Sequence, residues 1–230
     1  MWSGVIWKSL IGLVLLPLIA CAQQKNLPQP SRADTLLGSL NSYRTCYDVT
    51  FYDLSVQVDP QKRTIQGEVS CRFIWEGGAD TIQIDLEESL RIAEIWVDNQ
   101  KARYRRIPGT RAIWVALPQS QRWAVGTVHS WRVRYGGNPR SAPMPPWDGG
   151  FVWQKTPMGA PWIGVACQGL GASVWWPLKD HLSDEPDSLR ITICVPPPLR
   201  AVANGQPAGI HLKGKDSCFT YRITYPINTY

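Results

Sequence analysis

The chain has 230 residues, a formal net charge of +6 at pH 7 and a hydrophobic content of 44%. This length suits one large β-domain or two small ones, and the apolar content excludes an intrinsically disordered protein. The positive charge is modest and spread along the chain, which argues against a nucleic-acid-binding surface, so no nucleic-acid partner is predicted.

Residues 1–20 have the pattern of a secretory signal peptide. A basic residue, Lys8, precedes an apolar run that is too short to span a bilayer comfortably. The run ends in Leu18-Ile-Ala-Cys21, which looks like a bacterial lipobox, in which the cysteine is acylated after cleavage. We therefore predict lipidation at Cys21, and an exported protein that this lipid anchors to a membrane of the bacterial cell envelope. An ordinary signal peptide, cut near the same position, is the alternative.

Residues 21–45 are predicted to be the lipidated cysteine followed by a flexible tether. The stretch is polar and contains Pro28 and Pro30, so it offers little apolar surface with which to order itself. It would hold the domain that follows, residues 46–230, away from the membrane.

From Tyr47 onward the sequence alternates between apolar and polar residues, as half-buried strands do. Runs at 52–58 and 65–73, joined by the turn Asp59-Pro-Gln-Lys62, predict a hairpin with one buried face. Further strands are predicted at 82–86, 90–97, 112–117, 128–135, 189–195 and 219–225. Short strands separated by turns predict an all-β fold, an antiparallel and sandwich-like domain.

The stretch from Pro139 to Pro186 does not alternate in this way. It is rich in proline and includes Trp175 and Trp176 beside Pro177. A long irregular segment inside a compact domain usually has a function, so a long Pro/Trp-rich loop is predicted here.

The cysteines of the chain and the acidic residues of this loop do not predict a metal site. If Cys21 carries lipid, five cysteines remain, so at least one is unpaired, and no CxxC spacing occurs. Cys71 shares the parity of the apolar positions, which predicts a buried free thiol. The dense cluster of Asp180, His181, Asp184, Glu185 and Asp187 is predicted to be a solvated loop with turn-capping side chains rather than a metal or acid–base site. His129 is predicted to be a packed or rim residue rather than a base.

Two segments resemble a known family. The hairpin from Tyr47 to Gly67 and the segment from Gln168 to Pro186 resemble the N-terminal domain of zinc aminopeptidases of the M1 family, in a bacterial lipoprotein subgroup. The likeness covers about residues 47 to 228. It implies a saddle-shaped, mostly antiparallel β-domain that packs on a helical zinc-binding catalytic domain, its expected partner.

The resemblance also implies a role for Gln168. Family members use Gln or Glu at the matching position to hold the free amino group of the peptide substrate, and an amide oxygen can accept hydrogen bonds from that ammonium. A Gln that only holds the loop backbone is the alternative. For Trp175 and Trp176 the likeness favours packing at the domain interface over stacking on a sugar ring.

The residues that perform the family's chemistry do not occur in this sequence. The family binds zinc with a His-Glu-x-x-His helix and uses a Gly-x-Met-Glu-Asn loop, whereas this chain has only His129, His181 and His211, and neither motif. We predict no catalytic residue, metal site or cofactor on this chain, and expect zinc in the catalytic domain. The sequence ends at Tyr230, about where a family member would continue towards that domain, which suggests an interrupted gene product.

The predicted function is that of the non-catalytic N-terminal domain of a membrane-anchored M1-type aminopeptidase, an enzyme that removes N-terminal residues from peptides. The domain would pack on the zinc domain and help to bind the N-terminus of the peptide. The alternative is a stand-alone lipoprotein module that binds a glycan or a peptide through the Trp-rich loop.

Overall fold

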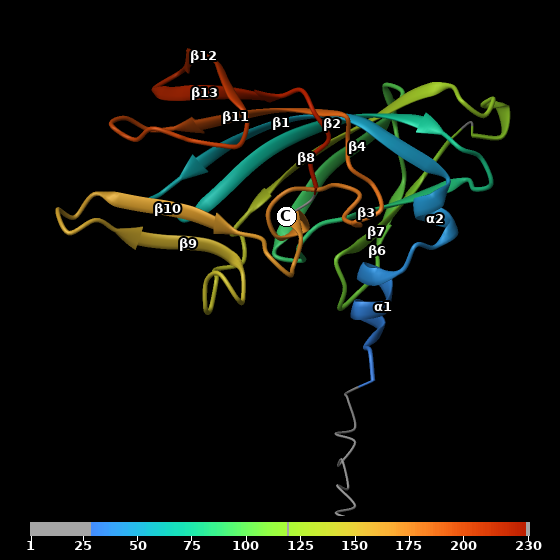
Figure 1. Cartoon of the computed structure of the whole chain (residues 1–230), viewed down its shortest axis with the longest axis horizontal. Helices are drawn as coiled ribbons and strands as arrows, with labels where there is room; N and C mark the ends of the chain where they lie inside the picture. The colour runs from blue at the N-terminus through green and yellow to red at the C-terminus, as the bar shows by residue number, and fades with distance from the viewer. Residues whose placement is uncertain (1–28, 119, 229–230) are drawn as a thin grey trace, which may run out of the picture.

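The computed structural model describes residues 29–118 and 120–228, and strands dominate them (Figure 1). The helical elements are short: α1 (Arg32–Gly38), α2 (Ser42–Thr45), and the 3-10 turns η1 (Ser120–Arg122) and η2 (Ala172–Val174). The strands are β1 (Tyr47–Asp59), β2 (Thr64–Trp75), β3 (Thr81–Asp85), β4 (Leu90–Val97), β5 (Gln100–Lys101), β6 (Tyr104–Arg106), β7 (Ala112–Ala116), β8 (Val128–Gly137), β9 (Gly150–Lys155), β10 (Pro161–Ala166), β11 (Ser188–Val195), β12 (Gln206–Lys213) and β13 (Asp216–Ile223). The predicted signal peptide and Cys21 lie outside the described residues.

The largest layer is an 8-stranded sheet in the order β12-β13-β11-β1-β2-β8-β4-β5. Its neighbouring strands are antiparallel, except that β1 and β11 run parallel, with Tyr52 opposite Leu189. The predicted hairpin is β1 and β2, joined at the expected turn. The prediction of an all-β, mostly antiparallel fold is confirmed.

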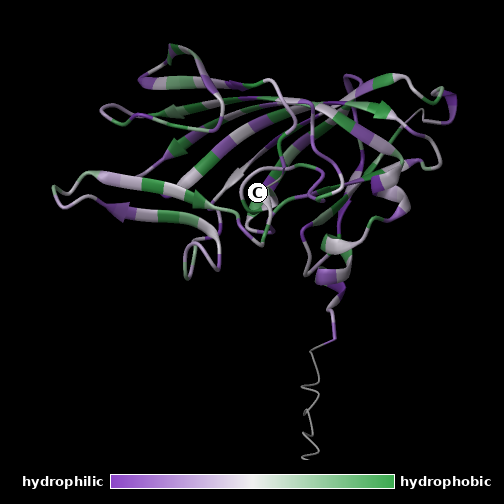
Figure 2. Cartoon of the chain, viewed as in Figure 1, coloured by the Kyte–Doolittle hydropathy of each residue, from purple (hydrophilic) through white to green (hydrophobic). Residues whose placement is uncertain are grey.

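A second layer covers one face of this sheet. It consists of the 3-stranded sheet β3-β7-β6 together with part of the Pro/Trp-rich loop (Figure 1). Every second residue of the long strands points into the core, and Figure 2 shows the resulting alternation of hydrophobic and hydrophilic bands along them. Burial of residues such as Leu54, Val69 and Trp131 against Ile84 and Ile113 supplies the main driving force for folding.

The Pro/Trp-rich loop is more ordered than the sequence indicated. It forms the two-stranded ribbon of β9 and β10, in which Trp162 pairs with Gln154. The ribbon lies beneath the β11-β13 end of the large sheet, on the left in Figure 1. The sequence analysis missed this hairpin, because its strands do not alternate cleanly between apolar and polar residues and because its proline and glycine residues indicated a loop.

The structure differs from the prediction for the second half of the tether. Residues 32–38 form α1, which begins with a capping box between Ser31 and Asp34, and residues 42–45 form α2. Arg44 is 0% exposed and pairs with the buried carboxylate of Asp85 on β3. The ordered domain therefore starts before Tyr47, because this buried ion pair and hydrogen bonds such as that from Gln83 to the carbonyl of Leu36 hold the polar segment.

Cys194 and Cys218 form a disulfide between directly opposed positions of β11 and β13. Cys46, Cys71 and Cys167 are free thiols, and Cys71 is buried as predicted. Burial raises the pKa of Cys167 to about 11, so this thiol stays protonated at neutral pH.

Removing this disulfide is expected to lower the free energy of unfolding by about 3 kcal/mol, because it closes a loop of about 24 residues in the unfolded chain. Denaturant unfolding of a Cys194→Ala and Cys218→Ala double variant measures the loss. A reducing agent should lower the free energy of unfolding of the unsubstituted chain by a similar amount. It should not change the free energy of unfolding of the double variant. Equal stability of the two proteins without reductant would contradict this contribution.

Within residues 29–118 and 120–228, no helix is both long and apolar enough to cross a membrane.

Candidate functional site

The loop that carries Gln168 follows β10 and is fixed by backbone hydrogen bonds. The amides of Leu170 and Gly171 donate to the carbonyl of Cys167, over 3.1 and 2.9 Å. Arg111 donates from Nη1 to the carbonyl of Leu170 over 2.6 Å. Gly169 and Gly171 have φ angles of 77° and 78°, a conformation that favours glycine. The turn therefore presents Gln168 from a rigid backbone.

Gly171 is the position where this turn tolerates least change. A Cβ atom there would lie 2.1 Å from Oδ2 of Asp180, and its φ angle is unfavourable for any other residue. We expect Gly171→Ala to cost about 1–3 kcal/mol of unfolding free energy and to displace Gln168. Thermal unfolding measures the cost. Gly159→Ala is a matched control, because Gly159 also has a positive φ of 82° but open space around it. Similar losses in both variants would contradict the role of the close contact with Asp180.

The side chain of Gln168 lies at a surface cavity of about 510 Å³. The other residues around the cavity are Asp34, Leu37, Gly38, Gly169, Leu170, Gly171, Asp180, His181 and Leu182. Gln168 is exposed, and no hydrogen bond joins its side chain to another residue of the described ranges. The amide is therefore available to a ligand, and the cavity combines hydrogen-bond acceptors with apolar walls.

Helix α1 forms one wall of this cavity, a feature that the sequence analysis missed. The carbonyl groups at its C-terminal end accept hydrogen bonds from the body of the domain: Leu36 from Gln83 over 3.0 Å and Leu37 from Arg44 over 2.6 Å. Nε2 of His181 lies 3.3 Å from the carbonyl of Gly38. These contacts satisfy carbonyl groups that a helix end leaves without partners. The Ser-x-x-Asp pattern at Ser31 was the available signal for this helix.

The acidic cluster in the loop is buried in part: Glu185 and Asp187 are exposed, as expected for a solvated loop, but Asp180 and Asp184 are not. Asp180 and Asp184 are each 5% exposed. Asp180 accepts a hydrogen bond from the amide of Ser173 over 3.0 Å, and Asp184 forms an ion pair with buried Lys179. Burial raises the pKa of Asp184, and the Lys179 ammonium opposes this shift. These carboxylates hold the loop against the sheets.

The two adjacent tryptophans of the loop pack into the domain. Trp176 is buried, with its ring centroid 5.0 Å from that of Tyr52, and Trp175 is half-buried 6.3 Å from Phe151. Trp176 thus has no free face for a sugar. The packing expected for Trp175 and Trp176 at a domain interface is therefore found within the domain itself, and the exposed residues near them are Trp162, at 63%, and Gln168.

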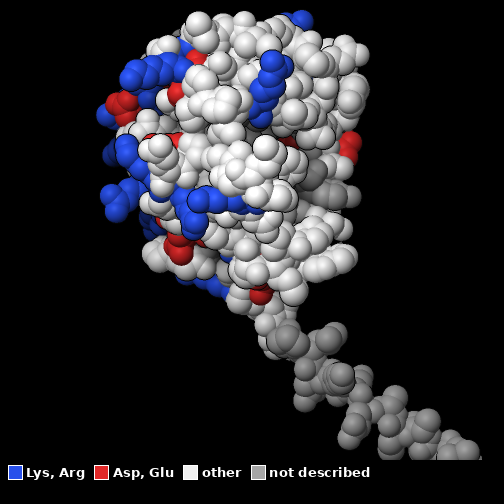
Figure 3. All heavy atoms as spheres, turned by 90° about the vertical axis from the view of Figure 1, so that its left-hand side faces the viewer, with Lys and Arg blue, Asp and Glu red and all other residues white. Residues whose placement is uncertain are grey.

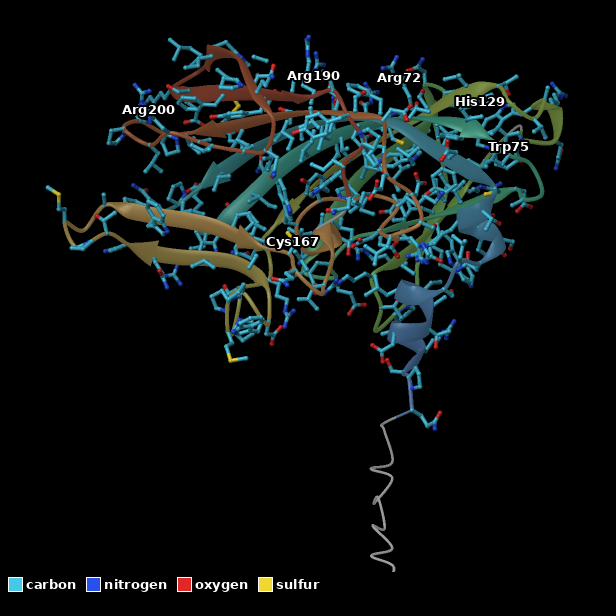
Figure 4. All side chains as sticks on the ribbon, in the orientation of Figure 1. Arg72, Trp75, His129, Cys167, Arg190 and Arg200 are labelled. Carbon is cyan, nitrogen blue, oxygen red and sulfur yellow. A yellow bond between two sulfur atoms is a disulfide. The ribbon has the colours of Figure 1, made fainter. Side chains whose placement is uncertain are left out.

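The histidines do not form a metal site in the part of the chain that the structure describes, where no group of three or more His, Cys, Asp or Glu side chains is suitably placed. His129 is packed, as predicted, with its ring stacked on Trp123 at 3.6 Å between centroids. Figure 4 shows His129 at one end of the molecule, far from Cys167, which directly precedes Gln168.

Comparison with known proteins identifies the fold. No family model and no curated protein matches the sequence. Among solved structures, the M1 zinc metallopeptidase of Deinococcus radiodurans matches 80% of this chain and 40% of its own, at 23% identity and a TM-score of 0.66. The chain has the fold of part of this M1 zinc metallopeptidase. A mutant of that enzyme bound to a Tyr-Ser-Ala substrate matches this M1-like domain over 81% of the chain, at 22% identity and a TM-score of 0.67.

The likeness extends to a eukaryotic protein. Yeast LTA4 hydrolase in complex with bestatin matches 94% of this chain at 18% identity, with a TM-score of 0.66. The M1-like domain spans 41% of the Deinococcus chain and 32% of the yeast chain. The predicted resemblance is thus confirmed at the level of the fold.

Proposed function

We propose that the chain is the non-catalytic N-terminal β-domain of a membrane-anchored M1-type zinc aminopeptidase. The observation that carries this proposal is the fold match to M1 zinc metallopeptidases over 81% of the chain. In this proposal the domain packs on a zinc-binding catalytic domain, which supplies the metal and the chemistry. The sequence itself contains no His-Glu-x-x-His.

An exposed apolar surface supports docking to such a partner. Strand β12 is exposed along its whole length, with Ile210 at 65% and Leu212 at 75%. Trp162 and Val165 on β10 are also exposed, and β10 and β12 lie at the same end of the molecule in Figure 1. Figure 3 shows that much of this side is uncharged, with Lys and Arg gathered mainly along one edge. Soluble monomers rarely leave such a surface uncovered, so a partner domain is expected there.

Gln168 would take part in substrate binding. Its amide oxygen can accept a hydrogen bond from the ammonium group of a peptide N-terminus, and it lies at an open cavity. The absence of an internal partner for this amide among the described residues favours the substrate role over a role in holding the loop.

The disulfide supports export. A bond between Cys194 and Cys218 is typical of oxidising compartments and rare in the cytosol. The proposed location is the cell envelope, with a lipid on Cys21 as the anchor. Labelling with radioactive palmitate tests the anchor, and a Cys21→Ala variant that still takes up label would exclude it.

The state of the chain in isolation tests the proposed docking surface. If a partner normally covers β12, the chain alone should bind a hydrophobic dye and self-associate, and Ile210→Lys with Leu212→Lys should reduce both. Dye fluorescence and sedimentation velocity measure these properties. Val128→Lys is the matched control, because Val128 is an exposed apolar residue on β8. A dye-silent monomer would favour the stand-alone binding module.

A further inference from the structure

A second surface cavity lies away from Gln168 and from the exposed strand β12. It measures about 660 Å³, which is within the range of small-molecule sites. Its lining includes Tyr43, Trp75, Asp80 and Trp123. Figure 4 places Trp75 at the end of the molecule opposite the β9-β10 ribbon. Nothing in the proposed aminopeptidase function uses this cavity.

The cavity joins aromatic rings to a single charge. Tyr43, Trp75 and Trp123 contribute rings, and the indoles of Trp75 and Trp123 meet at 84° with their centroids 5.4 Å apart. The indole of Trp75 is only 3% exposed and packs edge-to-face behind Trp123, so the half-buried rings of Trp123 and Tyr43 are the ones that a ligand can reach. Asp80 is the only carboxylate among the lining residues of the described ranges, and none of those residues is Lys or Arg. Asp80 is exposed and forms no ion pair with any residue in the described ranges.

The indole of Trp123 is held in place from behind. The His129 ring stacks on it at 3.6 Å with an interplanar angle of 18°. Nδ1 of His129 lies 2.6 Å from Oδ2 of Asp98, and Nε2 lies 2.8 Å from Oγ1 of Thr127. The amide of Ser130 also donates to Asp98, over 2.9 Å. A wall fixed in this way loses little conformational entropy when a ligand binds.

We propose that this cavity binds an alkylammonium group, such as the quaternary ammonium of choline. Aromatic faces attract such cations through the ring quadrupole, and a nearby carboxylate adds a Coulombic attraction. A neutral sugar would also stack on an indole, but it would gain nothing from the unpaired charge of Asp80. In a chain of net charge +6, an anionic and aromatic cavity without a basic residue selects a cation.

Calorimetric titration of the full chain, in a detergent that lacks an ammonium group, tests the proposal with choline as the probe. Choline should bind, and its neutral isostere 3,3-dimethylbutan-1-ol should bind about tenfold or more weakly. Equal binding of the two would overturn the proposal, because it would show a merely apolar site. Binding of maltose without binding of choline would also overturn it, in favour of a sugar site.

Variants assign the binding to the cavity. Asp80→Asn should weaken choline binding several-fold, because it removes the charge and keeps the shape. Trp123→Ala should weaken it about tenfold or more, with a melting curve to confirm that the variant is folded. Trp162→Ala and Asp187→Asn are matched controls, because both residues are exposed and neither lines the cavity. Full choline affinity in Asp80→Asn would overturn the proposal even if Trp123→Ala does not fold.

The ammonium group can come from a free metabolite or from a lipid headgroup. A short-chain phosphatidylcholine, used below its micelle concentration, separates the two sources. Tighter binding of this lipid than of choline identifies a headgroup site, and tighter binding of choline identifies a site for the free cation.

Discussion

Replacing Arg44 with methionine is expected to lower the free energy of unfolding by about 3–5 kcal/mol. Nη2 of Arg44 lies 2.5 Å from Oδ2 of Asp85, and the two side chains are 0% and 1% exposed. Removal of the guanidinium leaves a buried carboxylate without its counter-charge. The carbonyl of Leu37 also loses its donor, so the end of α1 should detach from the domain.

Denaturant unfolding measures the loss, and Arg32→Met is the matched control. Arg32 is an exposed arginine on α1, so its replacement should change the stability by less than about 0.5 kcal/mol. A second substitution, Asp85→Leu, should recover part of the loss, because it removes the unpaired acid. A small effect of Arg44→Met alone would show that the N-terminal segment is not locked to the domain.

The loss should also depend on pH. Burial raises the pKa of Asp85 to about 6, and the Arg44 charge opposes this rise. A raised pKa in the folded state means that stability is lost as pH rises through that pKa. Without Arg44 the pKa of Asp85 rises further. The variant therefore continues to lose stability at pH values above about 6, where the stability of the unsubstituted chain no longer depends on this group. The difference between the two proteins should therefore be constant below about pH 6 and grow above it.

Replacing Lys179 with methionine is expected to destabilise the domain by a similar amount, about 3–5 kcal/mol. Lys179 is buried, pairs with Asp184, and donates from Nζ to the carbonyl of Tyr47 over 2.5 Å. Its ammonium also lies 4.5 Å from the centroid of the Tyr47 ring. The substitution leaves Asp184 buried and unpaired, and it releases the Pro/Trp-rich loop from β1.

Unfolding free energy and near-ultraviolet circular dichroism measure this effect, because the loop carries Trp175 and Trp176. Lys155→Met is the matched control, since Lys155 is exposed on β9. If Lys179→Met keeps both the stability and the tryptophan spectrum of the original chain, the loop is held by its apolar contacts and not by this ion pair.

The fold was largely predictable from local sequence. The alternation from Tyr52 to Phe73 set the β1-β2 hairpin and its buried face, because a half-buried strand needs that period. The parallel pairing of β1 with β11 could not be read in this way, because it joins Tyr52 to Leu189 across most of the domain. Local patterns carry no information about such pairings.

The candidate site was predictable only in part. The resemblance supplied Gln168, but burial of polar residues escaped every local pattern. Arg44, Asp180 and Asp184 look like solvated residues in sequence, because charged side chains are rarely buried unless paired, and no local pattern shows which of them are paired. Asp85, the partner of Arg44, lies 41 residues away. Tertiary contacts therefore decided both the extent of the domain and the wall that α1 adds beside Gln168.

Sedimentation velocity of the chain mixed with a separately expressed zinc catalytic domain from an M1 relative tests the central claim most directly. The account predicts a single 1:1 complex, weakened by Ile210→Lys with Leu212→Lys and unaffected by Val128→Lys. The account is contradicted if the two proteins sediment as separate species at concentrations well above the dissociation constants of stable domain interfaces.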